Sequence, residues 1–461
     1  MSGENLKEYD VIVIGSGSGG EIVESSLNYG YKVAWVDKGP LGGTCLNNGC
    51  IPSKMLIYPA DRIMEIIEAK NLGINASIKN INFKKIMEHM REPIEDSRKH
   101  MRDGLKYPIK NFDYYEGLGY FIDNFTIMIN NEKIHGKKIF IGSGARVNIP
   151  DIKGINNIDF LSNENVFDIE KCPKSIIIIG GGYIGVEFAH FFSAMGSNVT
   201  ILQRGNSLIK KSEPEISDLL KNQMEKRMKI LTNTCLIEIK KNKSSFIVVY
   251  NQNNEINNKI EAEKIFIASG RKSNSDLLKI ENTDIDLDIN NFIKVNEYLE
   301  TSVKNIWAFG DSIGKYMFKH LANEEALICW HNSLGNHKIP MDYSAIPYAV
   351  FTHPQIASVG LTEFEAKKNH EILVGKAKYS DVAKGEAMME IHGFAKAIVD
   401  KKTSKILGFH IIGPYAPILI QEVINAMALG GDINFIGRGM HIHPALSELI
   451  LTTFSNLKET L

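Results

Sequence analysis

The 461-residue chain has few cysteines and almost no net charge, and each shortage excludes a class of protein. Five cysteines are too few for a small disulfide-stapled scaffold, so a reducing cytoplasm is the expected compartment. Because 53 lysines and arginines nearly balance 54 aspartates and glutamates, the net charge of −1 predicts no nucleic-acid or membrane-surface partner. No apolar run approaches the ~20 residues that a membrane-spanning helix needs. Residues 1–9 are polar and acidic, unlike a signal peptide.

The chain is long, and its share of apolar residues is ordinary. It is 44% hydrophobic and 23% charged, which is typical of a soluble globular protein. A length of 461 residues is enough for about three domains. Three of the five cysteines, Cys172, Cys235 and Cys329, are scattered singly, and we interpret them as buried or inert thiols.

A strand, a glycine-rich turn, a helical stretch and a second strand follow one another at the start of the chain. Residues 9–14 form an apolar run typical of a buried parallel strand. In the turn, Gly15 permits the tight bend, Gly17 lets a pyrophosphate approach, and Gly20 lets the helix pack on the strand. The second strand ends at Asp37, where an acid binds a ribose hydroxyl. This full context favours a dinucleotide site over a glycine-rich turn without a ligand.

Residues 42–54 carry the other two cysteines, Cys45 and Cys50, between glycines. Glycine lets backbone approach a cofactor closely, and Pro52 suits the first turn of a helix. The positive N-terminus of that helix predicts a stabilised thiolate at Cys50. A structural disulfide is disfavoured in a cytosolic protein, and half of a zinc site is disfavoured by the spacing.

A second dinucleotide fingerprint follows the apolar strand predicted for residues 175–179. Gly180, Gly182 and Gly185 take the three glycine roles, and a helix and a further strand come after them. Two such fingerprints predict two bound dinucleotides in separate domains. That arrangement suits the passage of a hydride from a nicotinamide to a flavin.

The strand after the second fingerprint ends without an acid. The position holds Gln203, followed by Arg204. An acid there would hold the 2′-hydroxyl of NADH and repel a 2′-phosphate, whereas arginine binds phosphate with paired hydrogen bonds. We therefore predict NADPH in preference to NADH. Lys210 and Lys211 are more simply explained as a solvated basic loop.

These motifs resemble those of the FAD-dependent pyridine nucleotide–disulfide oxidoreductases, which include dihydrolipoamide dehydrogenase, glutathione reductase, mercuric reductase and mycothione reductase. Residues 42–54 match the active-site motif of that family nearly letter for letter, and the resemblance covers essentially the whole chain. The segments 202–205, 273–278 and 319–323 are most similar to the mycothione reductase branch. Mercuric reductases carry an extra C-terminal cysteine pair, and residues 456–461 contain no cysteine.

The resemblance implies an α/β fold with two Rossmann-like dinucleotide-binding domains, for FAD and NAD(P), and a C-terminal α+β dimerisation domain. Residues 1–145 would form the FAD-binding domain with the redox disulfide, and residues 146–275 the NAD(P)H-binding domain. Residues 276–345 would complete the FAD site, and residues 346–461 would form the interface domain of a homodimer. In this last domain we expect strands at residues 350–354, 356–361, 394–399 and 406–412, and helices at residues 362–369 and 416–429.

The resemblance also implies roles for single residues. Cys45 and Cys50 would form the redox-active disulfide, with Cys50 next to the flavin and Cys45 exchanging with the substrate. Lys54 would lie near the flavin N5 and pair with Glu187; an ordinary surface ion pair is the alternative.

Four further residues match positions with known roles in the family. Asp311 would bind the ribityl chain of FAD, a role compatible with capping the following helix. Tyr183 would cover the flavin until nicotinamide arrives, although a core tyrosine fits equally well. His443, held by Glu448, would be the general acid/base that reaches the disulfide of the other subunit.

The fingerprints and the resemblance together give one set of predicted cofactor-binding residues, and no metal ligand. The set comprises Gly15, Gly17, Gly20, Asp37, Lys38, Gly43, Thr44, Lys54, Gly144, Asp311, Gly180, Gly182, Tyr183, Gly185, Gln203, Arg204, Gly270 and Arg271.

The predicted function is reduction of a small disulfide by NADPH through FAD and the Cys45–Cys50 pair, as in mycothione reductase. The main alternative is a dihydrolipoamide dehydrogenase that uses NAD in the oxidative direction. An NAD(P)H oxidase, a metal-ion reductase and a non-catalytic flavin-binding partner are the remaining alternatives.

Overall fold

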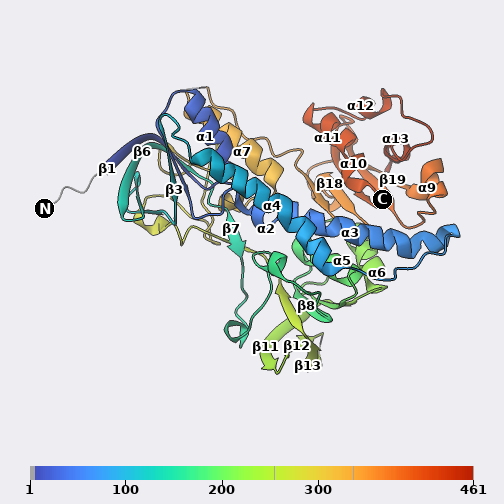
Figure 1. Cartoon of the computed structure of the whole chain (residues 1–461). Coiled ribbons are helices and arrows are strands. Elements are labelled where there is room, and N and C mark those ends of the chain that lie inside the picture. Colours follow the sequence, from blue (N-terminus) through green and yellow to red (C-terminus); the bar gives the residue numbers. More distant parts are fainter. Residues whose placement is uncertain (1–5, 254, 336, 460–461) are drawn as a thin grey trace.

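The computed structural model describes residues 6–253, 255–335 and 337–459. Residues 1–5, which belong to the polar segment 1–9, lie outside this part. Residues 460 and 461, at the end of the cysteine-free segment 456–461, also lie outside it. Figure 1 shows three regions with separate sheets, and long helices that cross the middle of the molecule. None of the helices in the described ranges is both long and apolar enough to cross a membrane.

The first region is a seven-stranded sheet in the order β3-β2-β1-β6-β5-β4, with β16 also paired to β6. Its central strands are rich in Val and Ile, which suit a sheet that is buried on both faces. Because β16 joins the sheet through β6, a segment from late in the chain completes a sheet begun at the N-terminus. The strands are β1 (Leu6–Ile14), β2 (Val33–Asp37), β3 (Phe112–Glu116), β4 (Tyr120–Phe121), β5 (Thr126–Ile129), β6 (Glu132–Ile141) and β16 (Ile306–Ala308). Helices α1 (Gly19–Asn28) and α7 (Lys319–Ser333) pack against each other beside it.

The second region contains a four-stranded parallel sheet in the order β10-β9-β8-β14. It also has an antiparallel sheet of three strands, β11-β12-β13, which the sequence analysis did not predict. The elements are β8 (Ser175–Ile179), α5 (Tyr183–Ala194), β9 (Asn198–Leu202), α6 (Pro214–Glu225), β10 (Lys229–Leu231), β11 (Thr234–Asn242), β12 (Ser245–Gln252), β13 (Glu255–Ala262) and β14 (Lys264–Ile267). Strands β7 (Ala145–Val147) and β15 (Arg271–Ser273) pair with each other where the chain leaves and re-enters the first region.

The third region is a six-stranded sheet, β17-β18-β21-β20-β19-β22, in which all neighbouring strands are antiparallel. Its strands are β17 (Pro347–Val350), β18 (Ile356–Gly360), β19 (Ile372–Lys378), β20 (Phe394–Asp400), β21 (Ile406–Ile412) and β22 (Lys458–Glu459). Its helices are α8 (Glu363–Ala366), α9 (Ala383–Ala387), α10 (Ala416–Leu419), α11 (Gln421–Ala428), α12 (Asn434–Gly437) and α13 (Glu448–Ser455). One face of the sheet buries its apolar residues under α11 and α13.

Helix α3 (Cys50–Glu68) links the first two regions. It follows the short helix α2 (Gly43–Asn48) and packs against both α4 (Phe83–Leu105) and α5. Leu56 and Ala60 of α3 share one apolar core with Val186 of α5, so burial of that core fixes the two helices to each other. The N-terminal ends of α3 and α5 carry the cysteine motif and the second fingerprint, and this packing brings the two motifs together.

Three predicted elements of the third region differ from the structure. The strand expected at residues 350–354 is β17, which ends at Val350, because the next backbone N–H, that of Phe351, donates to the Glu187 side chain and not to a neighbouring strand. The helix expected at residues 362–369 is reduced to α8, which Thr362 caps by accepting the backbone N–H of Glu365. The helix expected at residues 416–429 is divided into α10 and α11.

Candidate active site

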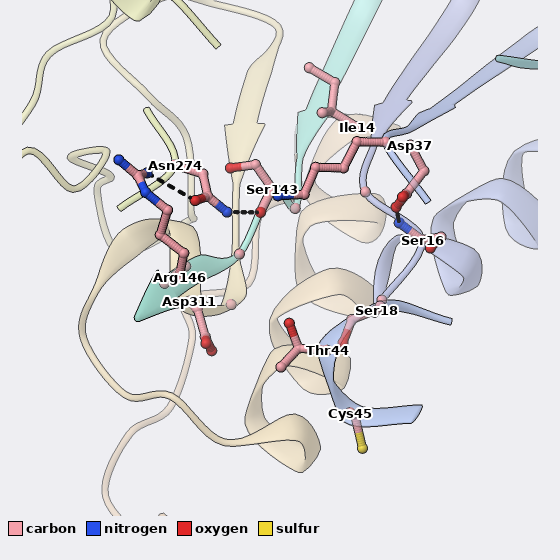
Figure 2. A pocket seen from close by; sticks show the side chains of 18 of the residues that line it. Ile14, Ser16, Ser18, Asp37, Thr44, Cys45, Ser143, Arg146, Asn274 and Asp311 are labelled. Carbon is pink, nitrogen blue, oxygen red and sulfur yellow. Dashed lines mark hydrogen bonds between the residues drawn. The ribbon is translucent and has the colours of Figure 1, made fainter. Parts of the chain in front are cut away.

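A cavity of about 460 Å³ lies between the first glycine turn, the cysteine motif and residues 142–146, with Arg271 and residues 309–311 also in its lining. Figure 2 shows Ser18, Thr44 and Cys45 near one another at one end of it, with Asp37 and Ser16 above them and Asp311 on the facing side. The sequence-predicted residues that line it are Gly15, Gly17, Asp37, Lys38, Gly43, Thr44, Cys45, Cys50, Gly144, Arg271 and Asp311.

The cavity has polar groups that suit a bound dinucleotide. The hydroxyl of Ser143 is buried in its wall and has no hydrogen-bond partner within the described residues. Ser18, at the N-terminus of α1, gives that helix no side-chain cap, so its free N–H groups and positive end suit a pyrophosphate. Burial raises the pKa of the Asp311 carboxyl, and the guanidinium of Arg271 lies 3.9 Å away from it. These groups fit FAD.

Asp37 lies at the end of β2, as the fingerprint predicts, and binds the glycine turn itself. One carboxylate oxygen accepts the backbone N–H of Ser16 (Figure 2). The other accepts that of Gly39 at 2.6 Å. The carboxylate therefore holds the turn in place as well as facing the cavity.

Gly20, the third glycine of this fingerprint, does not make the close helix–strand contact that the sequence predicts for it. A Cβ at Gly20 would meet only Trp35, at 3.9 Å, which is ordinary contact. A Cβ at Gly19 would lie 2.8 Å from the side chain of Val13 in β1. The close packing of helix on strand is therefore made at Gly19, because α1 begins there.

The cysteine motif is held against the first glycine turn by a contact that only glycine permits. Gly43 has φ +63°, and a Cβ there would lie 2.6 Å from the Cα of Gly17. Asn47 fixes the same loop, because its amide donates to the carbonyls of Pro40, Leu41 and Gly43. This packing sets the two cysteines at the cavity wall.

The surroundings of the two cysteines lower the pKa of Cys45 and raise the pKa of Cys50. Both cysteines are free thiols, and the hydrogen bond from the Cys50 thiol lowers the pKa of Cys45 to about 7 despite its partial burial. The charge of Lys319 and the backbone N–H groups of Cys50 and Ile51 lower it further. Loss of that hydrogen bond and burial raise the pKa of Cys50. Backbone N–H groups at the start of α3 thus lower the pKa of Cys45, the cysteine before the helix, whereas the sequence predicts the stabilised thiolate at Cys50.

Lys54 and Glu187 form the predicted pair across α3 and α5. The Lys54 ammonium lies 2.7 Å from the Glu187 carboxylate, which is only 8% exposed. The other oxygen of Glu187 accepts the backbone N–H of Phe351 at 2.9 Å, and the Lys54 ammonium lies 4.8 Å from the centre of the Phe351 ring. The burial of Glu187 distinguishes this pair from an ordinary surface ion pair.

A second polar link between α3 and α5 was not predicted from the sequence. Arg227 donates to Nδ1 of His190 at 3.0 Å, and Nε2 of His190 then donates to Asp61 at 2.8 Å. Burial lowers the pKa of His190 to about 4, so this histidine stays neutral. The three residues are too far apart in the chain for a spacing argument to connect them. They fix the helices that carry Lys54 and Glu187.

The second fingerprint repeats the geometry of the first with a neutral side chain. Gln203 accepts the backbone N–H of Gly181 through Oε1 at 2.9 Å, as Asp37 accepts that of Ser16 in the first fingerprint. Its amide nitrogen donates to the carbonyl of Ser207 at 3.1 Å. The residue after it, Arg204, is exposed. The turn therefore keeps its shape without presenting a carboxylate to a bound nucleotide.

The glycines of the second fingerprint show the close packing that the pattern predicts. A Cβ at Gly185 would lie 2.0 Å from the carbonyl oxygen of Gly180, while a Cβ at Gly182 would meet nothing within 4 Å. Gly182 therefore leaves space where a nucleotide backbone would approach. Gly270 lies outside the cavity lining, although the next residue, Arg271, belongs to it.

Tyr183 belongs to a group of three rings from three segments of the chain. Its ring centre lies 5.3 Å from that of Tyr348 in β17 and 6.0 Å from that of Phe318 before α7. Burial raises the pKa of the Tyr183 hydroxyl. The side chain is therefore packed and only partly exposed, which fits both a covering ring and a core ring.

His443 and Glu448 form the predicted pair on the third region. Nδ1 of His443 lies 2.9 Å from one oxygen of Glu448, and the other oxygen accepts the backbone N–H of Ala445 at 3.0 Å. The hydrogen bond from His443 lowers the pKa of Glu448. His443 is exposed and does not line the cavity that contains Cys45 of the same chain. Figure 1 shows α13, which begins at Glu448, well away from α2 with Cys45.

Glu325 is a further buried group that sequence reasoning missed. It accepts the backbone N–H of Gly310, next to Asp311, at 2.7 Å, and the hydroxyl of Tyr343 at 2.9 Å. Burial raises the pKa of Glu325 to about 7. It holds the turn that presents Asp311. Within the described ranges, no group of three His, Cys, Asp or Glu side chains gathers as a metal site would require.

Comparisons with known proteins agree with this geometry. The pyridine nucleotide-disulphide oxidoreductase family matches residues 9–326, and its dimerisation domain matches residues 346–454. The chain belongs to this family. Its members are FAD-dependent enzymes that use NAD(P)H. The predicted fold class is confirmed: two Rossmann-like dinucleotide-binding domains precede a C-terminal dimerisation domain.

Three similar proteins show the breadth of this oxidoreductase family. Mycothione reductase from Mycobacterium tuberculosis is 33% identical over 98% of this chain and 100% of that protein. Dihydrolipoyl dehydrogenase from Bacillus subtilis is 31% identical over 96% of each chain. The Cu(II) complex of the HOCl-induced flavoprotein disulfide reductase RclA from Escherichia coli has a TM-score of 0.86 at 27% identity, over 98% of this chain and 99% of that chain.

Proposed function

We propose that this oxidoreductase is a homodimer in which NADPH reduces a small disulfide substrate through FAD and the Cys45–Cys50 pair. The observation that carries the proposal is the thiol pair in the wall of the dinucleotide cavity, with the more acidic thiol at Cys45. Each turnover consumes NADPH and one proton and converts one disulfide into two thiols. The extent of similarity to mycothione reductase supports a low-molecular-weight disulfide.

The two cysteines divide the exchange chemistry between them. The Cys45 thiolate attacks one sulfur of the substrate disulfide, forms a mixed disulfide and releases the first thiol once its sulfur takes up a proton. The Cys50 sulfur, after losing its proton, attacks Cys45, closes the internal disulfide and releases the second thiol. Bound FAD supplies the hydride chemistry that connects the internal disulfide to NADPH.

Protons are handled by residues of the chain itself. His443 with Glu448 is the general acid/base that protonates the departing thiolate. Because His443 is exposed and lies away from Cys45 of its own chain, we propose that the partner subunit's His443 serves each site. Lys54 and Glu187 hold the nicotinamide side of the site together at the junction of α3, α5 and Phe351.

The preference for NADPH rests on Gln203 and Arg204. Gln203 holds the turn with a neutral amide, so no carboxylate repels a 2′-phosphate. Arg204, the next residue, is exposed. Charge-assisted hydrogen bonds of this kind contribute about 1.5–3 kcal/mol, which corresponds to about a tenfold to hundredfold preference.

We expect the double variant Gln203→Glu/Arg204→Leu to reverse the coenzyme preference. Glutamate can still accept the Gly181 N–H and hold the turn, but it repels the 2′-phosphate and binds the 2′-hydroxyl of NADH. The kcat/KM ratio of NADPH to NADH, measured with a fixed disulfide acceptor, should fall by about 10²-fold or more. Lys211→Met is the matched control, because this exposed lysine of the same segment should leave the ratio within about twofold.

The same assay decides between the proposed reductase and its main alternative. Lipoamide is used as the acceptor with the unchanged enzyme, and NADPH is compared with NADH at equal concentration. Fast lipoamide turnover that prefers NADH would overturn the proposal in favour of a dihydrolipoamide dehydrogenase. Flavin reduction by NADPH with little lipoamide turnover agrees with a different cellular disulfide.

A further inference from the structure

A buried ion pair joins the second region to the third, at the far end of the loop that begins with Gln203 and Arg204. We call residues 203–213 the nucleotide loop, because they connect β9, the strand after the second fingerprint, to α6. Glu213, the last residue of this loop, is 1% exposed, and Lys396 of β20 is 3% exposed. The Lys396 ammonium donates to the Glu213 carboxylate at 2.8 Å. A cation of the third region thus lies against the end of the nucleotide loop.

Glu363 of α8 completes this contact from the third region. One of its carboxylate oxygens lies 2.6 Å from the Lys396 ammonium, and its backbone N–H donates to the Glu213 carboxylate at 2.5 Å. The carboxylate of Glu215, in the first turn of α6, also accepts from Lys396 at 3.3 Å. Burial by itself lowers the pKa of Lys396, but the hydrogen bonds to Glu213 and Glu363 raise it, so the side chain stays charged.

The other part of the nucleotide loop is bonded to the second fingerprint. The backbone N–H of Gly181 donates to Gln203, and its carbonyl accepts the N–H of Ile209 at 2.9 Å. The side chain of Leu208 packs against the same turn, since a Cβ at Gly181 would lie 2.5 Å from it. Ile209 stands four positions before Glu213, so a shift at Glu213 is passed to these contacts within a short stretch of chain.

A second contact ties the end of the loop to the ring group around Tyr183. Ser212 accepts the hydroxyl of Tyr348 at 3.2 Å, and the centre of the Tyr348 ring lies 5.3 Å from that of Tyr183. Tyr348 belongs to β17, so the third region contacts the loop at two neighbouring residues, Ser212 and Glu213. The nucleotide loop is therefore fixed by the second fingerprint on one side and by the third region on the other.

We propose that Lys396 is a positioning residue for NADPH, because its ion pair with Glu213 holds the nucleotide loop with Gln203 and Arg204 at the second fingerprint. This inference rests on the proposed use of NADPH and adds a residue from a different region of the chain. Lys396 acts through Glu213 and not by contact with the coenzyme or the disulfide. Without the ammonium, Glu213 becomes a buried carboxylate that has lost its counter-charge, which favours movement of the loop end toward water.

Limited digestion with trypsin tests whether Lys396 holds the loop. Lys210 and Lys211 are exposed residues of the loop and give trypsin two sites. FAD-loaded enzyme is digested without any pyridine nucleotide, and peptide mass spectrometry compares cleavage at these two lysines with cleavage at Lys70, an exposed lysine after α3. In Lys396→Met, cleavage in the loop relative to Lys70 should be about tenfold faster. An unchanged ratio would overturn the proposal.

Stopped-flow measurement of flavin reduction tests whether the held loop positions the coenzyme. The dependence of the rate on NADPH concentration gives an apparent Kd and a limiting rate, with no disulfide substrate present. In Lys396→Met, the Kd for NADPH should rise about tenfold, while the limiting rate stays within about twofold. Faster loop cleavage with an unchanged Kd would overturn the proposal, because the loop would then be held without effect on the coenzyme. A preference of the unchanged enzyme for NADH would instead contradict the proposed coenzyme, and the trypsin result would still report on the loop.

Two further variants separate the ion pair from a general loss of stability. Ile398→Ala removes a buried side chain of β20 that packs with Ala366 of α8, and both readouts should stay within about twofold. The double variant Glu213→Gln/Lys396→Met removes both charges, so it leaves no unpaired carboxylate at position 213 and is expected to fold even if Lys396→Met does not. Its Kd for NADPH should also rise about tenfold, because the ion pair is gone. An unchanged Kd in the double variant would overturn the proposal.

Discussion

Replacement of Cys45 by serine lowers disulfide turnover by about 10³-fold or more and leaves reduction of bound FAD by NADPH at its normal rate. A serine hydroxyl does not ionise near neutral pH, so the group that attacks the substrate is lost. The groups that hold the two dinucleotides lie on other residues, for example Asp37 and Gln203. The hydride step is therefore expected to survive the substitution.

Two measurements check this result on one protein preparation. Anaerobic stopped-flow spectroscopy follows the bleaching of the flavin by NADPH, and a steady-state assay follows reduction of lipoamide or another small disulfide. Cys235→Ser is the matched control, since Cys235 is an exposed single cysteine on β11. Disulfide reduction by Cys45→Ser at the normal rate would contradict the exchange role. Loss of flavin bleaching would show that Cys45 serves the hydride step as well.

The second large effect is expected at His443. His443→Gln removes the general acid/base and should lower turnover by about 10²-fold to 10⁴-fold. Glu448→Gln should cost less, because the amide can still hold the imidazole through one hydrogen bond but no longer stabilises its charged form. Replacement of His441, which pairs with Glu422 at 3.0 Å instead, provides the matched control.

Subunit mixing tests where His443 acts. Cys45→Ser and His443→Gln chains are co-expressed with different tags, and the heterodimer is purified. If the partner subunit's His443 serves each site, one site of the heterodimer has both an intact cysteine pair and an intact histidine. Activity should then be about half that of the unchanged dimer. If each His443 served its own chain, both sites would lack a group and activity would stay near that of the single variants.

Features that depend on local backbone geometry could be predicted from the sequence. The strand–glycine turn–helix units, the acid at Asp37 and the departure at Gln203 all follow from spacing along a few turns of chain. The pairing of Lys54 with Glu187 came from the family resemblance instead, because 133 residues separate the two and no spacing connects them. The structure then added what the pattern did not contain, namely that Glu187 is buried and also holds Phe351.

Features that depend on three-dimensional packing were missed or misplaced. Helix α3 does begin at Cys50, but only the structure shows that backbone N–H groups at its start act on Cys45 as well as on Cys50. Gly20 was given the packing role that Gly19 has, since the exact first residue of a helix cannot be read from a glycine run. Lys319 is brought to Ser18 across 301 residues of chain, and no local pattern reports that contact.

The central claim is that electrons from NADPH reach the Cys45–Cys50 pair. The oxidised enzyme is therefore mixed anaerobically with about one equivalent of NADPH per bound FAD, then quenched with a thiol-alkylating reagent and analysed by peptide mass spectrometry. The account predicts that Cys45 and Cys50 change from unreactive to alkylated, while Cys172, Cys235 and Cys329 react equally with and without NADPH. A reduced flavin with Cys45 and Cys50 still unreactive would contradict it and would favour an oxidase or a metal-ion reductase.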